Sequence, residues 1–204
     1  MLDTEHSYKR AWLSAASQLS YPLDDGFYYT LVGRTNAAGE AALTERFGEQ
    51  FPLPRFREMW AGLWRREVEA SGIPRKPGLT ELLKYLSAHK IPAAIATSSE
   101  QEYASFSLKA AGLDARQFAH IVTGEQVEKG KPAPDIYLEA ARRLGANPTR
   151  CLALEDSDAG ILSASAAGMI AVMVPDLKPP SPQARQAAFR VLTSLNEVVL
   201  LLAG

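Results

Sequence analysis

The sequence predicts an α/β protein, with a doubly wound parallel sheet in the second part of the chain and a smaller helical domain in the first. After residue 78, short apolar segments alternate with helical patterns, as strands covered on both faces of a parallel sheet require. Before residue 72 the apolar residues have helical spacing instead. Hydrophobic residues make up 47% of the 204 residues, which is ample for a buried core.

Helices are expected throughout residues 3–72. One helix face carries apolar residues at three-and-four spacing, namely Trp60, Leu63, Trp64 and Val68. We expect this aromatic face to pack against other helices rather than to hold a cofactor. The segment 73–78 contains two prolines and a glycine and is expected to be a hinge. We therefore place a helical domain at residues 1–75 and an α/β domain at residues 76–204.

Strands and helices alternate in the α/β domain, which begins with a helix. The expected strands are apolar runs at 91–96, 119–123, 150–154, 170–174 and 189–192. The expected helices are 79–89, 101–111, 135–144, 159–167 and a last one from Leu195. Strands of this kind, separated by helices, form a parallel sheet with helices on both faces.

Composition excludes several classes of protein. The formal net charge is −1 and neither sign accumulates in a block, so we expect no binding to nucleic acid or to an anionic membrane. No apolar stretch approaches the roughly 18 residues of a membrane span, and no signal peptide is recognisable, so a cytoplasmic location is expected. The single cysteine excludes an internal disulfide. The oligomeric state is not predicted.

Polar residues suited to phosphate or metal follow three of the expected strands. They are Thr97, Ser98, Ser99, Lys131, Glu155 and Asp156. In an open parallel sheet, ligands gather beyond the carboxyl ends of the strands, because loops and helix N-termini there offer free backbone donors. We therefore expect these residues to meet in one cleft. Lys131, followed by two prolines that stiffen the backbone, is a suitable point charge for a phosphoryl group.

Some of these residues have a second explanation as helix caps. Ser99 and Glu102 have the spacing of a capping box, so Ser99 serves either a cap or a phosphate. Asp135 is expected to cap the helix that follows it, and either Asp158 or Ser157 the next one, with Asp158 favoured. The adjacent carboxylates Glu155 and Asp156 repel each other unless a cation or a basic partner lies near. Magnesium, which takes one or two protein carboxylates together with a substrate phosphate, suits such a pair.

Two segments carry a resemblance to a known family. Gly130-Lys131-Pro132-Ala133-Pro134-Asp135 and Leu154-Glu155-Asp156-Ser157-Asp158-Ala159-Gly160-Ile161 resemble the later motifs of the haloacid dehalogenase superfamily, in its subfamily of β-phosphoglucomutase-like phosphatases. The resemblance implies a Rossmann-like core beneath a helical cap. It assigns Thr97 and Lys131 to catalysis, Asp156 to direct Mg²⁺ binding, and Glu155 to a supporting or water-mediated role.

The resemblance also implies an activity. It points to a Mg²⁺-dependent phosphatase that acts on a small phosphorylated metabolite, a sugar phosphate being favoured, through an aspartyl phosphate. Ser98 and Ser99 would contact the phosphate. The segment Leu31-Val32-Gly33-Arg34-Thr35 resembles the loop in which such caps place specificity residues. Arg34 is therefore either a contact for a phosphate or carboxylate, or a surface arginine.

The beginning of the chain, Met1-Leu2-Asp3-Thr4-Glu5, resembles the tail of the family's first motif, a strand followed by Asp-x-Asp-Gly-x-x-x-Asp-Thr-Glu. By this match both catalytic aspartates belong ahead of Met1, and none of the 204 residues is the nucleophile. We expect a sheet that lacks its first, central strand and is either gapped beside the strands that end at Thr97 and Leu154 or completed there by a foreign segment. Without that strand we expect no phosphatase activity.

Two alternatives stay open. The chain could belong to a phosphosugar mutase, although Asn36 stands where mutases of the family have an arginine. It could also be a catalytically inactive binding protein or fragment of the same fold, because phosphate-binding residues are present where the nucleophile is not.

Overall fold

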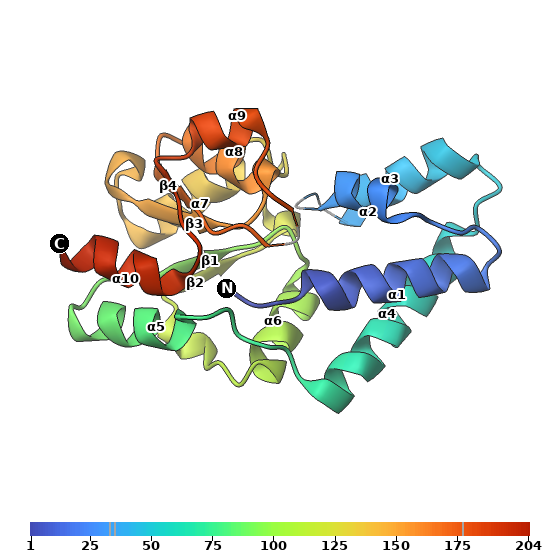
Figure 1. Cartoon of the computed structure of the whole chain (residues 1–204), viewed down its shortest axis with the longest axis horizontal. Coiled ribbons are helices and arrows are strands. Elements are labelled where there is room, and N and C mark those ends of the chain that lie inside the picture. Colours follow the sequence, from blue (N-terminus) through green and yellow to red (C-terminus); the bar gives the residue numbers. More distant parts are fainter. Residues whose placement is uncertain (33, 35, 177) are drawn as a thin grey trace.

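The structure is a computed structural model of the chain and describes residues 1–32, 34, 36–176 and 178–204 (Figure 1). Helices α1 (Glu5–Gln18), α2 (Asp25–Leu31), α3 (Asn36–Phe47) and α4 (Leu53–Ser71) form the first part. Helix α1 packs along α4, where Tyr8 stacks on Trp64 with ring centroids 4.7 Å apart. Trp60, Trp64 and Val68 are buried, so the prediction that this face packs against other helices is confirmed.

The second part alternates helices and strands. Its elements are α5 (Leu79–Ala88), β1 (Ala94–Ala96), α6 (Gln101–Ala110), β2 (His120–Val122), α7 (Asp135–Leu144), β3 (Leu152–Glu155), α8 (Asp158–Ala166), β4 (Ile170–Met173), α9 (Pro182–Ala187), β5 (Arg190–Val191) and α10 (Leu195–Ala203). Every expected strand and helix is present, and the strands are shorter than expected. Helix α9 is not among the helices expected from the sequence. It forms because Pro182 occupies its first position and the Ser181 hydroxyl accepts a hydrogen bond from the Ala184 amide.

The sheet exists in two pieces. Strand β1 pairs with β2, and β3 pairs with β4, which pairs with β5; all these pairings are parallel. In the described part of the chain, β1 and β3 each have a strand on one edge only. The expected gap beside the strands that end near Thr97 and Leu154 is therefore present in the structure.

Helices cover both faces of the sheet. Helices α5, α6 and α10 lie on one side of it and α7, α8 and α9 on the other (Figure 1). The apolar core forms two clusters accordingly: one includes Leu82 and Val198 together with the aromatic residues of α4, and the other includes Ile136 and Ile161. No helix among the described residues has the length and apolarity needed to cross a membrane.

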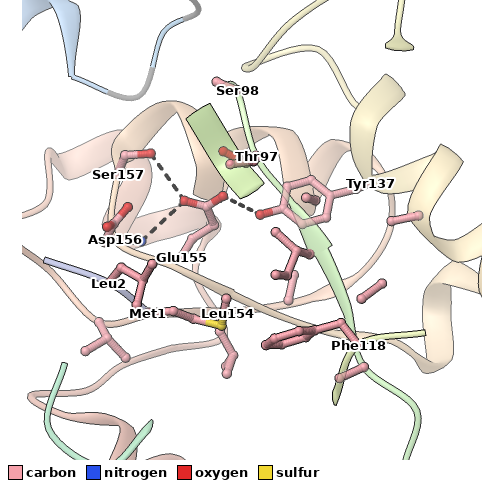
Figure 2. Close-up of a pocket in the computed structure, with 18 of the residues that line it drawn as sticks. Met1, Leu2, Thr97, Ser98, Phe118, Tyr137, Leu154, Glu155, Asp156 and Ser157 are labelled. Atoms are coloured by element: carbon pink, nitrogen blue, oxygen red, sulfur yellow. Dashed lines mark hydrogen bonds between the residues drawn. The ribbon is translucent and has the colours of Figure 1, made fainter. Parts of the chain in front are cut away.

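The first residues of the chain run beside the segment that joins the two parts. Leu2 forms an isolated antiparallel bridge with Arg75. The Asp3 amide donates to the Pro74 carbonyl and the Lys76 amide donates to the Met1 carbonyl, each at 2.9 Å. These bonds hold the start of the chain against residues 74–76, and Figure 2 shows Met1 and Leu2 close to Leu154 of β3.

Candidate active site

A cavity of about 640 Å³ opens where the helical part meets the sheet. All the residues that the sequence singled out for a site line it, from both parts of the chain. They are Arg34, Thr97, Ser98, Ser99, Lys131, Glu155 and Asp156. In Figure 2 the polar end of the pocket holds Thr97, Glu155 and Asp156, and its apolar end holds Leu154 and Phe118. The structure thus brings the expected polar residues together in one place.

Lys131 lies at the centre of the polar end. Its ammonium forms an ion pair with the Glu155 carboxylate and donates to the Ala96 carbonyl at 3.2 Å. The side chains of Lys131 and Glu155 are each only 7% exposed. The ammonium also lies 5.1 Å from the centre of the Tyr137 ring. Lys131 therefore connects the carboxyl end of β1 with that of β3 across the gap in the sheet.

Glu155 is held by several donors. Besides Lys131, the Tyr137 hydroxyl donates to Oε1 and the Ser157 hydroxyl donates to Oε2 at 3.3 Å (Figure 2). Burial raises the pKa of Glu155, but Lys131, the Tyr137 hydroxyl and the Asp156 amide outweigh burial and hold the pKa below its usual value. A Cβ atom on Gly160 would overlap the Glu155 carboxylate, so the first turn of α8 needs glycine there. Glu155 and Lys131 therefore form a buried ion pair.

Asp156 has a different environment from its neighbour. Burial and the charge of Glu155 raise the pKa of Asp156, against the lowering effect of the N-terminal ammonium and Lys131. Burial and Asp156 in turn raise the pKa of Glu5 to about 7, although the Tyr28 hydroxyl donates to Glu5 at 3.3 Å. Carboxylates thus crowd this end of the cavity, and a bound cation would relieve their repulsion. The donor set fits a hard cation such as Mg²⁺.

The raised pKa of Glu5 predicts a pH dependence of stability. Its pKa in the unfolded chain is near 4.5, so the folded state binds the extra proton between that pH and about 7. Its contribution to stability is therefore complete below pH 4.5 and lost as the pH rises through 7. Relative to Glu5→Gln, we expect the wild-type free energy of unfolding to fall by about 2 to 3 kcal/mol from pH 4.5 to 8.

Urea unfolding of both proteins across this pH range, with EDTA present, measures the difference. The Glu45→Gln variant, with a substitution on an exposed part of α3, is the control and should parallel the wild type. If the wild type and Glu5→Gln have the same pH dependence, Glu5 is an ordinary solvated carboxylate and the prediction is wrong.

Thr97 and the two serines follow β1 directly. The Thr97 hydroxyl accepts a hydrogen bond from the Ser99 amide at 3.1 Å, which closes a tight turn at the strand end. The capping box expected from Ser99 and Glu102 does not form, because Glu100 is the N-cap of α6 and accepts no side-chain capping bond. The capping alternative for Ser99 is thus removed, and Ser99 lines the cavity.

The two aspartates expected as helix caps have other roles. Ser157, not Asp158, caps α8, with its hydroxyl accepting from the Gly160 amide at 3.1 Å. Asp158 accepts from the Ser181 amide at 3.2 Å and so fastens the segment before α9. Asp135 is the first residue of α7 rather than its cap, and accepts from the Lys129 amide at 3.3 Å. The expected cap at Asp135 and the preference for Asp158 over Ser157 were wrong because a carboxylate one residue inside a helix can bond to a neighbouring loop instead.

Arg34 lies at the rim of the cavity and is exposed. Its amide donates to the Leu31 carbonyl at 3.0 Å. Residues 33 and 35 of the same expected loop lie outside the described residues, and so does the side chain of Asn36. The structure therefore places Arg34 where a ligand in the cavity could reach it, and leaves the comparison at Asn36 untested.

Two features of the site had no clear signal in the sequence. Tyr137 sits in the first turn of α7, where helical periodicity marks it only as a core residue. The other feature is a group of three possible metal ligands, Asp3, His6 and Asp176. The Lys76 ammonium lies 2.5 Å from Asp176 and 3.4 Å from Asp3, and so supplies the positive charge of this group. The group is therefore an ion-pair cluster that ties the start of the chain to the loop after β4.

Comparison with known proteins gives consistent matches. A family model described as haloacid dehalogenase-like hydrolase matches residues 1–168. The chain is 33% identical to a probable pseudouridine-5'-phosphatase of Drosophila melanogaster, over 97% of this chain and 86% of the relative. It is 31% identical to a fructose-1-phosphate phosphatase of Escherichia coli, over 85% of this chain and 90% of the relative.

Larger relatives and solved structures agree with these matches. The chain spans 44% of a bifunctional riboflavin kinase/FMN phosphatase of Arabidopsis thaliana, at 31% identity over 83% of this chain. The crystal structure of CbbY from Rhodobacter sphaeroides in complex with phosphate superimposes with a TM-score of 0.81 at 26% identity, covering 97% of this chain and 91% of CbbY. The α/β fold and the helical layer above it are therefore those of a well-populated group of proteins.

Proposed function

The chain belongs to the haloacid dehalogenase-like hydrolases, and on this premise we propose that it serves in the Mg²⁺-dependent hydrolysis of a small phosphorylated metabolite, with sugar phosphates as the favoured class. One observation carries the proposal. Lys131, Thr97 and Asp156 lie together at the carboxyl edge of the sheet, beneath the helical part, and line the same cavity. The names of the relatives, phosphatases of nucleotide-like and sugar phosphates, support it.

We propose distinct roles for the residues that line the polar end. Lys131, fixed by Glu155, offers its remaining donor capacity to the phosphoryl oxygens, and the hydroxyls and amides of Thr97, Ser98 and Ser99 orient them. Asp156 would hold Mg²⁺, with Glu155 acting through Lys131 and through water. When bound, the ion would neutralise Asp156 and polarise the phosphoryl group.

The proposed reaction has two displacements at phosphorus. A carboxylate attacks in line, the bond from phosphorus to the ester oxygen breaks, and that oxygen takes up a proton as it leaves. Water then attacks the aspartyl phosphate, releasing inorganic phosphate and restoring the carboxylate. We assign the attacking carboxylate to an Asp-x-Asp-Gly segment ahead of Met1, because Asp3 and Glu5 are engaged with His6 and Tyr28 at the start of the helical part.

We propose that residues 1–75 act as a cap and residues 76–204 as the core. Tyr8, Trp12 and Tyr28 line the cavity from the helical part, and closure of that part over the sheet would exclude water and select the substrate. Arg34 at the rim is placed to contact a second anionic group of the substrate. The cytoplasmic location and the absence of a nucleic-acid partner stay predictions from the sequence.

The test compares two proteins. One is the 204-residue chain. The other is the same chain with an N-terminal extension, which consists of an apolar strand, then Asp-x-Asp-Gly, then one residue that links it to Met1. We expect the extended chain to hydrolyse p-nitrophenyl phosphate and sugar phosphates with Mg²⁺, to stop with EDTA and to recover when Mg²⁺ is restored. The 204-residue chain should show only background turnover.

The matched control is the extended chain with the first aspartate of the added motif replaced by asparagine, which should fold and be inactive. If a folded extended chain fails to turn over any phosphate monoester, the phosphatase proposal is wrong and the inactive binding protein is favoured. A requirement for a sugar bisphosphate, with phosphate moved rather than released, would identify the mutase alternative.

A further inference from the structure

The turn that follows β1 lies beside the residues that follow β2. The two strands pair in parallel, so both leave the sheet at the same edge. The Thr97 amide donates to the Val122 carbonyl at 3.0 Å, which extends the ladder past the end of β1. The Gly124 amide then donates to the Ser99 carbonyl at 3.2 Å. The carboxyl end of β2 therefore holds the turn 97–99 at both of its ends.

The backbone of this turn approaches Gly124 very closely. A Cβ atom on Gly124 would lie 2.5 Å from the carbonyl oxygen of Ser98 and 3.1 Å from its carbonyl carbon. Cβ atoms essentially never make a contact as short as the first of these. Both atoms belong to the backbone, so rotation of a side chain cannot relieve the overlap. Gly124 has no positive φ, so the lack of space, and not the backbone conformation, requires glycine there.

The end of β2 is held more firmly than the turn. The Gln126 side chain accepts from the Thr123 amide at 3.4 Å, and the Gln126 amide donates to the Thr123 carbonyl at 3.0 Å. Thr123 is also fully buried. Thr97 and Ser98, in contrast, are half-buried and line the cavity (Figure 2). A methyl group added at position 124 would therefore displace the turn toward the cavity, because the close-packed side cannot yield.

Lys131 is fixed independently of this turn. Its ammonium donates to the Ala96 carbonyl at 3.2 Å and pairs with the Glu155 carboxylate. A displacement of the turn alone would therefore change the distance between its donors and the Lys131 ammonium. When catalysis depends on positioning, a shift of about 1 Å costs on the order of 100-fold in rate.

We infer that Gly124 is a positioning residue, whose lack of a side chain places the turn 97–99 so that the turn and the Lys131 ammonium can hold the same phosphoryl group. Gly124 does not line the cavity, so it acts through the turn and touches no ligand itself. This role rests on the proposed function, in which the turn and Lys131 contact phosphoryl oxygens.

The first test measures phosphate binding by the 204-residue chain and its Gly124→Ala variant. The probe is inorganic phosphate, titrated in the presence of Mg²⁺ and followed by calorimetry. We expect the variant to bind phosphate on the order of tenfold more weakly, because its turn donors no longer match the position of Lys131. A folded Gly124→Ala chain with wild-type phosphate affinity would overturn the inference.

The matched control is Gly62→Ala, the same substitution in the middle of α4. A Cβ atom there would meet only the flexible guanidinium of Arg66, at 3.4 Å. Gly62→Ala should bind phosphate like the wild type. An equal loss of affinity in both variants would also overturn the inference, because the loss would then not depend on the turn.

Kinetics of the extended chain separate positioning from a general loss of structure. Gly124→Ala should raise the inhibition constant of inorganic phosphate on the order of tenfold and lower kcat/KM on the order of 100-fold. The factor should be the same for p-nitrophenyl phosphate and for sugar phosphates, since the phosphoryl group is common to both. A loss of folded protein would lower the maximal rate and leave the inhibition constant unchanged. That result would contradict the positioning role.

A second variant keeps the test decisive should Gly124→Ala fail to fold. Gln126→Ala removes the acceptor of the Thr123 amide without adding an atom near the turn. The Gln126 side chain is exposed and lies outside the cavity, yet we expect about threefold weaker phosphate binding. The neighbouring exposed residue gives the control, and Glu125→Ala should bind like the wild type. Wild-type affinity in Gln126→Ala would show that the end of β2 does not set the turn.

The positioning role and the phosphatase proposal can fail separately. If the extended chain binds phosphate without turnover, the phosphatase proposal is wrong, and a weaker affinity in Gly124→Ala still supports the positioning role. A wild-type protein that binds no phosphate, either as the 204-residue chain or as the extended chain, would overturn the positioning role.

Discussion

Asp156→Asn is expected to lower kcat/KM for phosphate monoesters by about three orders of magnitude in the extended chain, and to raise thermal stability at the same time. Loss of the charged Mg²⁺ ligand removes several kcal/mol of charge stabilisation from the transition state. The stability gain follows from the environment, because burial and Glu155 raise the pKa of Asp156 and thus disfavour its charged form in the folded protein.

The control variant for this prediction changes Asp158, two residues after Asp156. Asp158→Asn has the same chemistry at a position that does not line the cavity and keeps an oxygen to accept from Ser181. It should leave kcat/KM within about a factor of two, since surface substitutions away from a site change little. Steady-state kinetics at several Mg²⁺ concentrations and thermal unfolding measure both effects. Full activity of Asp156→Asn would remove Asp156 from the site.

Lys131→Met is expected to lower the free energy of unfolding by about 3 to 5 kcal/mol, because it leaves the buried Glu155 carboxylate without its charge partner. The loss should be smaller at pH 5 than at pH 8. Without Lys131, burial raises the pKa of Glu155, so protonation at lower pH removes the unpaired charge.

Two further variants isolate the ion pair. In the double variant Lys131→Met with Glu155→Gln, most of the lost stability should return, because no charge is then left buried. Lys129→Met, an exposed lysine two residues earlier, should stay within about 0.5 kcal/mol of the wild type. Urea unfolding at both pH values provides the measurement. A loss of stability in Lys131→Met that the double variant does not recover would show that Lys131 acts through packing alone.

The alternation of strands and helices could be predicted because it is a local property of the chain. Buried parallel strands need uninterrupted apolar runs, and their carboxyl ends share one edge of the sheet, so the position of Thr97, Lys131 and Asp156 followed from the order of elements. Helix caps were predicted less well. Ser157 and Asp158 are adjacent and both can cap a helix, and the choice between them depends on where Ser181 lies in space.

The sequence by itself determined the fold class, because that depends on periodicity and on the order of segments, and its resemblance to a known family predicted the gap in the sheet. Only the tertiary structure decided which charged groups lie close to one another. It pairs Glu155 with Lys131 and Tyr137, brings Glu5 beside Asp156, and shows which edges of β1 and β3 are free. The physical reason is that burial and Coulomb interactions depend on distance through space, and residues that are 24 or 151 positions apart carry no local signal of their contact.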